Sequence, residues 1–191
     1  MFQCAKGAKK ANQVLGQISR AISFRDKYTF CKLYKVYVRP HLQYCSSAWS
    51  PYTVADNEIL ENVQRRAVNM ITNLTGTYEQ KLATLGIYTL EESRIRGDMI
   101  EMYKLMSGKS KCEASKFFKL MPAREGARST QSNTGYLNVE EPHLAKSDMR
   151  RNLLFYRCPR VWNSLPDAIK QVGTVNSFKA AYDAHVAESR V

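Results

Sequence analysis

The spacing of apolar residues in the first forty positions of the chain predicts two amphipathic helices. The opposite face of each helix carries lysine, arginine or glutamine. Asp26 is expected to cap the second helix, and Pro40 to end it, because proline cannot continue a helix. The apolar face of the first helix, residues 6–22, consists of Ala8, Ala11, Leu15, Ile18 and Ile22. That of the second, residues 26–39, consists of Phe30, Leu33, Tyr34, Tyr37 and Val38.

Helical spacing continues to about residue 108. Pro40 is expected to begin a short helix, which ends at the break of residues 50–52. Thr53 and Asp56 resemble a capping pair for a helix to about residue 71. Two more helices are predicted at residues 78–85 and 90–106, stopped by Gly86 and Gly108. The aligned positions of the short helix are Leu42, Cys45, Ser46 and Trp49, and the core face of the capped helix is Ile59, Leu60, Val63, Ala67 and Met70.

Residues 109–146 differ in composition, because Ser, Gly and Pro are scattered among charges there. This predicts a long loop, with a short extended piece at residues 136–139. An apolar and basic stretch at residues 150–162, a turn at 163–166 and a last helix at 177–187 come after it. The predicted fold is mainly α: a basic helical bundle (1–108), a linker (109–146) and a small C-terminal helical unit (147–191).

Composition indicates a globular protein. The chain has 191 residues, of which 44% are hydrophobic, and a mean hydropathy of -0.43. No segment approaches the ~20 apolar residues of a membrane span. Lys6 lies where a signal peptide would have its apolar centre, so we expect an intracellular protein, either nuclear or cytoplasmic and not secreted. The five cysteines are an odd number at wide spacing, which predicts that their thiols are free and that most of them are buried. His41 and Cys45 would share a face of a helix, but two ligands do not make a structural zinc site.

The positive charge of the chain is concentrated at its beginning. Lys and Arg number 29 against 17 Asp and Glu, a formal net charge of +12. Residues 1–40 hold nine basic residues against Asp26 alone, an excess of +8. A concentrated positive field favours polyanions, chiefly nucleic acid. The nine are Lys6, Lys9, Lys10, Arg20, Arg25, Lys27, Lys32, Lys35 and Arg39.

Catalytic motifs are missing from the sequence. Polymerases hold two metal ions with paired carboxylates, but no two aspartates are adjacent here. Phosphate-cradling glycine loops, HExxH and GxSxG are absent as well. Asp98 and Glu101 lie on a predicted helix of alternating charge, where carboxylates usually form a solvated face. We therefore expect no catalysis by this chain alone, no cofactor and no small-molecule substrate.

Short segments of the chain carry a family resemblance through their order and spacing. They are residues 9–16 (KKANQVLG), 25–27 (RDK), 33–35 (LYK), 38–45 (VRPHLQYC), 49–52 (WSPY), 63–67 (VQRRA), 85–86 (LG), 89–92 (TLEE), 94–100 (RIRGDMI), 103–104 (YK), 162–166 (WNSLP) and 175–179 (VNSFK). Together they resemble the C-terminal part of reverse transcriptases from non-LTR retrotransposons of the chicken-repeat and jockey type.

The resemblance implies that the chain corresponds to the thumb of such a polymerase and the region beyond it. The catalytic palm and its Mg²⁺ would then precede this chain. The first helices would pack beside that palm and grip the RNA/DNA template–primer duplex. Two features depart from the family pattern. Pro159, which follows Cys158, is expected to break a helix. Met1 stands where the palm would join, which suggests a truncated element, a misread gene start or a captured fragment.

The candidate nucleic-acid-binding residues are the nine N-terminal cations together with Arg65 and Arg66. The alternative for the nine is an ordinary solvated helix surface. For Arg65 and Arg66 the alternative is pairing with Glu58 and Glu61 on the same helix. Five aromatic side chains, Tyr28, Tyr34, Tyr37, Tyr44 and Trp49, either stack on bases or pack in the core, and core packing is favoured. Trp162 is expected to anchor the C-terminal unit.

Two hypotheses of different class remain. In the first, the chain is a nucleic-acid-gripping part of a reverse transcriptase, inactive alone. In the second, it is a helical module that binds other proteins. A decayed remnant of such an element, without a selected function, is the third possibility. No membrane partner is expected.

Overall fold

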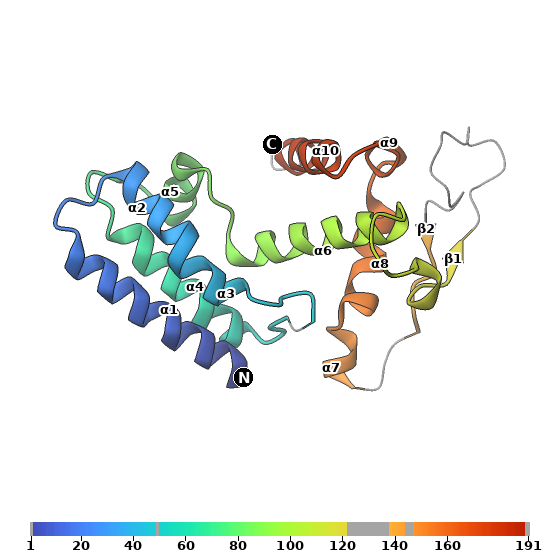
Figure 1. Ribbon diagram of the computed structural model, residues 1–191, viewed down its shortest axis with the longest axis horizontal. Coiled ribbons are helices and arrows are strands. Elements are labelled where there is room, and N and C mark those ends of the chain that lie inside the picture. Colours follow the sequence, from blue (N-terminus) through green and yellow to red (C-terminus); the bar gives the residue numbers. More distant parts are fainter. Residues whose placement is uncertain (1, 49, 122–137, 144–146, 190–191) are drawn as a thin grey trace. The chain divides into compact units, whose positions relative to one another are not determined.

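Helices dominate the computed structural model, which describes residues 2–48, 50–121, 138–143 and 147–189 (Figure 1). The mainly α fold predicted from the sequence is therefore confirmed. The chain divides into two compact units, Met1–Arg94 (unit 1) and Ile95–Val191 (unit 2). The boundary between the two units lies within α6 (Leu90–Met106), whose first residues belong to unit 1, whereas the sequence predicts a boundary after Gly108. Every helix of the described residues is too short or too polar to span a bilayer.

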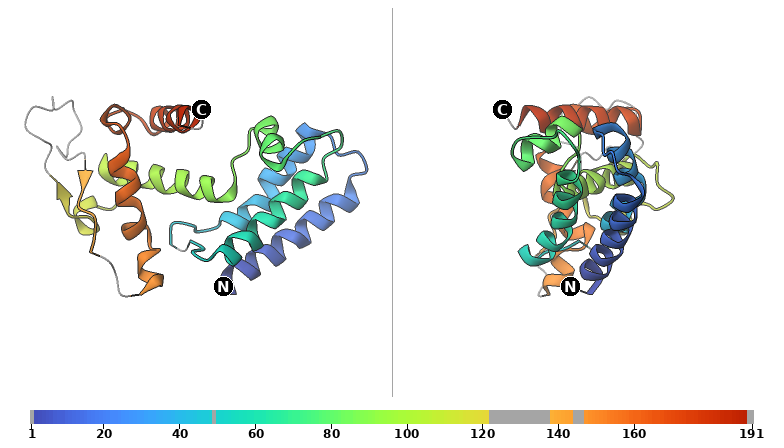
Figure 2. Two further views of the ribbon diagram at one scale, coloured as in Figure 1. Left: turned by 180° about the vertical axis from the view of Figure 1, so that it is seen from behind. Right: turned by 90° about the vertical axis from the view of Figure 1, so that its left-hand side faces the viewer.

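Unit 1 is a helical bundle built around its longest helix. This helix, α1 (Phe2–Ala21), packs against α4 (Val54–Asn69), α3 (Arg39–Gln43) and the turn before α3, η1 (Tyr34–Val38). The remaining helices are α2 (Lys27–Leu33) and α5 (Tyr78–Leu85). The two views of Figure 2 show α1 and α4 lying side by side. The apolar faces of the first helices are thus buried within the unit itself.

The predicted second helix is continuous through Pro40, which corrects the expectation that it ends there. Pro40 lies in the first turn of α3, and the five residues before α3 form a π-helical turn, η1. The N–H of Arg39 bonds to the carbonyl of Tyr34, five residues earlier. A proline ring crowds the carbonyl four residues before it, and the wider π turn relieves that crowding.

The π turn also changes which residues face the core. The buried positions of this segment are four residues apart. A wider turn keeps residues four apart on the same face of the helix and rotates residues three apart away from that face. Tyr37 was expected on the apolar face and is 55% exposed. The predicted short helix stops at Gln43, and Cys45 lies outside it with φ 55°, so Cys45 and His41 do not share a helix face. The buried residues of this segment are Phe30, Tyr34, Val38 and Leu42.

Several helix ends coincide with the capping residues that the sequence predicts. The carboxylate of Asp26 accepts hydrogen bonds from the N–H groups of Tyr28 and Thr29, both at 3.0 Å, and these bonds lower the pKa of Asp26. Thr53 accepts from the N–H of Asp56 at the start of α4. Gly86, with φ 59°, closes α5 in the left-handed region. These local signals place the helices along the chain.

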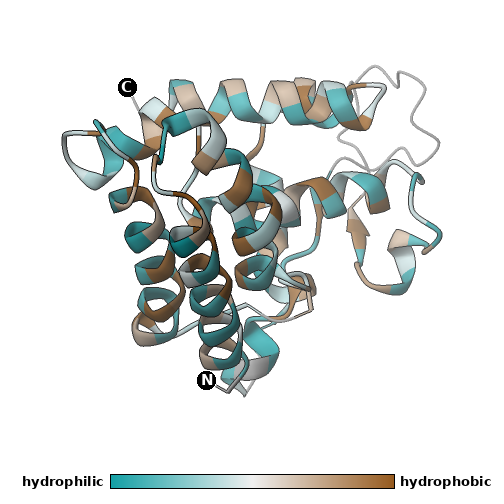
Figure 3. Cartoon of the chain, turned by 60° about the vertical axis from the view of Figure 1, so that its left-hand side comes forward, coloured by the Kyte–Doolittle hydropathy of each residue, from teal (hydrophilic) through white to brown (hydrophobic). Residues whose placement is uncertain are grey.

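One predicted core position of α4 is wrong. Ile59 is 41% exposed, whereas Gln64 is fully buried on the face that also buries Leu60 and Val63. The reason is the direction of the core: Ile59 lies one residue, about 100° of helix rotation, from Leu60. Gln64 occupies the core because the polar groups of Tyr34, Tyr78 and Tyr88 converge on its amide. Hydrophobic and hydrophilic residues alternate along the helices in Figure 3.

Unit 2 is organised around aromatic side chains. It contains the rest of α6, strands β1 (Leu120–Met121) and β2 (Asn138–Val139), and helices α7 (Asp148–Arg151), α8 (Leu154–Ser164), α9 (Asp167–Lys170) and α10 (Val175–Glu188). A short 3-10 turn, η2 (Ala114–Lys116), precedes β1. Tyr103 stacks on Phe178 with ring centroids 4.5 Å apart, and Trp162 lies 6.1 Å from Phe178. Trp162 is buried in this core, as expected for an anchor of the C-terminal helices.

Pro159 does not break its helix, contrary to prediction. It lies inside α8, which continues from Leu154 to Ser164. Leu154, Cys158 and Trp162 are spaced by four and are all buried in the core of unit 2. Packing of this apolar stripe outweighs the one backbone hydrogen bond that a proline removes.

The predicted loop contains a two-stranded ladder. Leu120 pairs with Val139, and Met121 with Asn138, in antiparallel register. The extended piece predicted at residues 136–139 is confirmed for its last two residues, β2. Residues 136 and 137, like Trp49, lie outside the described part of the chain.

Candidate nucleic-acid interface

The outer face of α1 carries four basic side chains. Helical geometry places Lys6, Lys9, Lys10 and Arg20 opposite the buried stripe of this helix, and all four side chains are at least partly exposed. Gln13 and Gln17 lie between them on the same face. The buried stripe consists of Cys4, Ala8, Ala11 and Leu15. We call Lys6, Lys9, Lys10 and Arg20 the α1 basic face.

No negative charge offsets the α1 basic face within its helix. The sequence of α1 contains neither aspartate nor glutamate. Among the described residues, none of the four cations forms an ion pair. From Lys6 to Arg20 the helix rises about 21 Å. That length equals the axial rise of about six phosphates along one strand of a duplex.

A groove extends this face toward α4. It encloses about 580 Å³ and is lined by Lys10, Arg20 and Arg66 together with other residues of α1, most of them polar. Arg66 comes from α4, and its Nη1 donates to Oδ1 of Asn12 at 3.5 Å. The structure thus brings together two predicted segments that are about fifty residues apart in sequence.

The remaining lysines form a separate group along α2 and η1. Lys27, Lys32 and Lys35 line a smaller groove of about 260 Å³ and are in contact with solvent. Thr84 and Leu85 of α5 provide its other wall. The two grooves share no lining residue. The eleven predicted cations are therefore not one surface, a division that the sequence did not predict.

Arg25 and Arg39 are used within unit 1. Nη2 of Arg25 donates to the carbonyl of Ser19 at 3.0 Å, and Nη2 of Arg39 donates to Oγ of Ser93 at 2.8 Å. Both arginines are half-buried, and the Nε atom of each is buried without a hydrogen-bond partner among the described residues. These two side chains link elements of the bundle and are less accessible to a ligand than the lysines.

Arg65 and Arg66 do not pair with Glu58 or Glu61 in the described residues, contrary to the alternative considered for them. Arg65 donates to Oδ1 of Asn62 and lies 5.2 Å above the ring of Tyr78. Glu61 turns inward instead, and its Oε2 accepts from the N–H of Leu90 at 3.0 Å. Both arginines remain exposed.

A buried polar network below this surface joins the helices. The hydroxyl of Tyr34 donates to Oε1 of Gln64 at 2.6 Å, and Nε2 of Gln64 donates to the hydroxyl of Tyr78 and to the carbonyl of Tyr88, both at 3.1 Å. Tyr78 in turn donates to Glu61. Burial raises the pKa of Tyr34 and of Tyr78 well above that of a free phenol, with the bond to Glu61 adding to the rise for Tyr78. The network holds α4, α5 and η1 in register.

Three of the aromatic side chains are placed contrary to the favoured core assignment. The side chains of Tyr28 and Tyr44 are 70% and 73% exposed, and that of Tyr37 is exposed as well. Tyr34 alone is buried among those that the structure describes. Tyr28 lies in the first turn of α2, two residues after the cap Asp26, where it lines the lysine groove.

No family model matches the chain, and neither a curated protein nor a solved structure is significantly similar to it.

Within the described residues, no three His, Cys, Asp or Glu side chains gather in a metal-binding arrangement. All five cysteines are free: Cys4, Cys31 and Cys158 are buried, whereas Cys45 and Cys112 are exposed. Burial raises the pKa of Cys4 and Cys158 above that of a free thiol.

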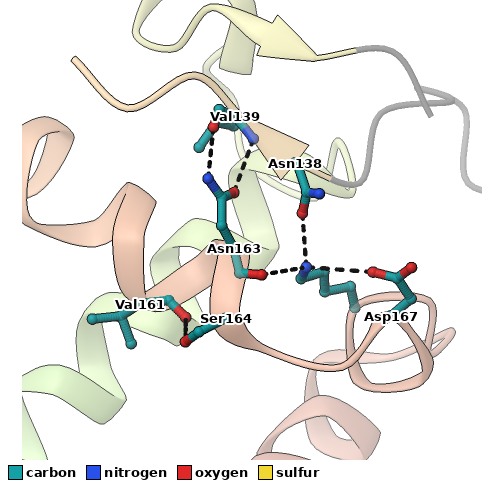
Figure 4. A network of polar contacts seen from close by, with 7 residues as sticks. Asn138, Val139, Val161, Asn163, Ser164 and Asp167 are labelled. Carbon is teal, nitrogen blue, oxygen red and sulfur yellow. Dashed lines mark hydrogen bonds and ion pairs between the residues drawn. The ribbon is translucent and has the colours of Figure 1, made fainter. Parts of the chain in front are cut away.

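The segment of residues 162–166 has a structural role in unit 2 (Figure 4). The side chain of Asn163 accepts from the N–H of Val139 at 3.1 Å and donates to its carbonyl at 2.8 Å, as a neighbouring strand would. Nζ of Lys170 donates to Oδ1 of Asn138 at 2.8 Å and lies 3.4 Å from the carboxylate of Asp167. Burial lowers the pKa of Lys170, partly opposed by Asp167. These contacts hold β2 against the end of α8.

Two arginine pairs hold the helices of unit 2. Arg96 of α6 binds Asp183 of α10 with two hydrogen bonds, at 2.6 and 2.8 Å. Arg157 of α8 binds Asp98 of α6 in the same bidentate manner. Asp98 is buried, which corrects the expectation of a solvated face. Arg96 and Asp98, both in the segment of residues 94–100, therefore hold helices of unit 2 together.

Proposed function

We propose that this chain binds the sugar–phosphate backbone of a nucleic-acid duplex through the α1 basic face and Arg66. One observation carries the proposal: four cations align along the solvent side of a helix that contains no acid, and none of them pairs with an acid among the described residues. Such a surface attracts phosphates without reading bases. Arg66 adds a fifth cation from the adjacent helix.

The number of cations sets the expected strength of this binding. Each phosphate neutralised by a cation releases counterions, so the affinity falls with salt by about 0.9 log units per log unit for each contact. Five contacts give a slope of about -4.5, or roughly a 500-fold loss between 50 and 200 mM salt. Binding by this surface is therefore strongly salt-dependent and insensitive to sequence.

We further propose that the duplex is an RNA/DNA template–primer and that the chain belongs to the thumb, and the region beyond it, of a non-LTR retrotransposon reverse transcriptase. The order of the segments in the sequence supports this, together with the basic surface on the first helix. In this proposal a palm domain is the protein partner of the chain, and Mg²⁺ is bound by that palm. The chain contributes binding and positioning, and not chemistry.

The test is binding of a fluorescent RNA/DNA hybrid to the full chain, measured by anisotropy between about 50 and 200 mM salt. The variant Lys6→Gln/Lys9→Gln/Lys10→Gln removes three positive charges from the α1 basic face. The variant Lys111→Gln/Arg160→Gln/Lys179→Gln removes three from unit 2 and serves as the matched control. We expect the first variant to lower the salt slope by about 2.7 and the second to leave it nearly unchanged.

The proposal fails if the wild-type chain shows no salt-sensitive binding. Equal losses in the two variants would also contradict it, since they would indicate attraction by net charge alone. Circular dichroism of both variants should match that of the wild type, because all six side chains lie at least partly in solvent.

A second candidate function, binding to other proteins, has its own supporting observation. Most of the exposed large apolar side chains belong to unit 1, where they include Val36, Tyr37 and Val54. Exposed apolar side chains of this kind are typical of protein contact surfaces when they gather in one patch. A pull-down that returned a protein partner after nuclease treatment, with no duplex binding in the anisotropy experiment, would favour this function.

A further inference from the structure

We propose that the groove between α2, η1 and α5 is a binding site for single-stranded nucleic acid, separate from the α1 basic face. In this site the ring of Tyr28 stacks on a base, and Lys32 and Lys35 bind the adjoining phosphates. The inference rests on the proposed function in that both assume a nucleic-acid ligand. It adds a second site and a different form of that ligand.

The first argument is the state of Tyr28. Its side chain is 70% exposed, and its hydroxyl has no hydrogen-bond partner among the described residues. Nζ of Lys27 lies 5.1 Å from the centre of its ring. A cation over one face of a tyrosine ring leaves the other face for a base, and stacking on an exposed aromatic ring is how proteins bind single strands without sequence preference.

The second argument is the position of the cations relative to that ring. Tyr28, Lys32 and Lys35 all line the groove, so α2 and η1 present the ring and both lysine side chains along it. Neither lysine is buried, and neither forms an ion pair with a described residue. A base on the ring therefore brings its flanking phosphates next to two cations that no described carboxylate neutralises.

The third argument is size. The groove encloses about 260 Å³, less than half the volume of the one beside α1. Thr84 and Leu85 of α5 also line it. A single unpaired base and its sugar fit such a space, whereas a duplex, whose bases are paired and stacked inside, cannot present a base to the ring. The combination of an aromatic ring with cations favours a nucleotide over an acidic peptide, which has carboxylates but no planar base to stack.

The experiment uses the full chain and two probes, a short single strand that carries 2-aminopurine and the fluorescent RNA/DNA hybrid. Tyr28→Ala removes the stacking ring, Tyr28→Phe keeps it, and Tyr37→Ala is the matched control, an exposed tyrosine outside the groove. We expect Tyr28→Ala to weaken single-strand binding roughly 5- to 100-fold and to abolish the quenching of 2-aminopurine, while Tyr28→Phe and Tyr37→Ala retain both. Lys32→Gln/Lys35→Gln should weaken single-strand binding and lower its salt slope by about 1.4, at about 0.7 per contact.

Duplex binding separates failure of this inference from failure of the proposed function. If the hybrid binds through the α1 basic face but Tyr28→Ala leaves single-strand affinity and quenching unchanged, the single-strand site is refuted and the duplex site stands. If Tyr28→Ala weakens both probes equally, the separate site is refuted as well. If the single strand binds with quenching and the hybrid does not bind, the groove is supported and the duplex proposal fails. Displacement of the single strand by an acidic peptide at equal charge concentration would show a general polyanion surface and overturn the inference.

Discussion

Asp98 and Arg157 form the most enclosed ion pair among the described residues of unit 2. Nε and Nη2 of Arg157 each donate to a different oxygen of Asp98, both at 2.7 Å. The side chain of Asp98 is only 5% exposed and that of Arg157 only 18%. Asp98 lies on α6 and Arg157 on α8, 59 residues apart. The pair fixes the angle at which these two helices meet, because a bidentate contact holds both side chains in one plane.

Removal of Arg157 should destabilise unit 2 strongly. Arg157→Ala removes the two hydrogen bonds that the guanidinium donates to the buried carboxylate of Asp98, and loss of one partner of a buried ion pair costs about 3 to 5 kcal/mol. Lys116→Ala is the control, since Lys116 and Glu113 form an exposed pair at 3.5 Å that contributes about 0.5 kcal/mol or less. Urea denaturation followed by tryptophan fluorescence measures both. Equal effects of the two substitutions would show that burial of the pair is irrelevant.

The two glycines of α1 should respond oppositely to alanine. A Cβ at Gly7 would lie 2.9 Å from the backbone carbonyl oxygen of His41, so Gly7→Ala forces α1 away from α3 and should cost about 1 to 3 kcal/mol. At Gly16 the nearest atom is the flexible end of Arg20, 3.9 Å away. Gly16→Ala should therefore stabilise α1 by about 0.5 to 1 kcal/mol. Midpoints of urea denaturation test the pair, and a stabilising Gly7→Ala would contradict the close approach of the two helices.

The hydroxyl of Tyr34 should matter to stability, and that of Tyr37 should not. Tyr34→Phe removes the donor to Gln64 and leaves that buried amide oxygen without this bond, at a cost of about 1 to 3 kcal/mol. Tyr37→Phe changes an exposed side chain and should shift stability by less than about 0.5 kcal/mol. Thermal denaturation of both variants measures the difference. A similar midpoint for the two would argue that the network around Gln64 contributes nothing net.

Stability should decline in alkaline solution. Burial raises the pKa of Cys158 and Cys4 in the folded chain, so these thiols stay neutral there while they ionise in the unfolded chain. The pKa of each thiol is higher in the folded chain than in the unfolded chain, where it is near 9. The contribution of these thiols to stability is therefore complete below about pH 9 and is lost as the pH rises above that value. Tyr34 and Tyr78 add the same effect above about pH 10. The measurement is the free energy of unfolding between about pH 8 and 11. Cys158→Ala should make the decline of this free energy with pH less steep at about pH 9 to 10. An unchanged decline would exclude Cys158 as a source of the effect.

Thiol reagents should distinguish two classes of cysteine. Cys45 and Cys112 are exposed and should react within the mixing time of an Ellman assay at neutral pH. Cys4, Cys31 and Cys158 are buried and should react only as fast as the chain opens. Cys45→Ser/Cys112→Ser should abolish the fast phase and leave the slow one. A fast phase that survived this double substitution would show that one of the three buried thiols is accessible.

Much of the secondary structure was predictable because its signals are local. Asp26 marks the beginning of α2, Thr53 and the apolar spacing mark α4, and Gly86 marks the end of α5, each close to where the structure has it. The α6 helix has the predicted bounds. Each of these features involves residues within about four positions of one another, so a single segment contains the whole cause.

The exceptions arise where the local pattern competes with other contacts. Pro159 remains helical because the core of unit 2 holds the residues on both sides of it. Tyr37 turns outward because Pro40 widens the helix before it. Asp98 is buried because an arginine 59 positions later neutralises it. None of these outcomes can be deduced from the apolar spacing of the segment concerned.

The candidate site shows the same division. The sequence by itself determined that the first forty residues carry most of the positive charge and that Lys6, Lys9, Lys10 and Arg20 lie on the polar side of a helix, because charge and helical period are properties of the chain. Only the tertiary structure decided that Arg66 joins this face, that Arg25 and Arg39 turn into the bundle, and that the other lysines line a second groove with Tyr28. Those placements depend on how α1, α2, α4 and α5 pack, and packing is set by contacts between segments that are remote in sequence.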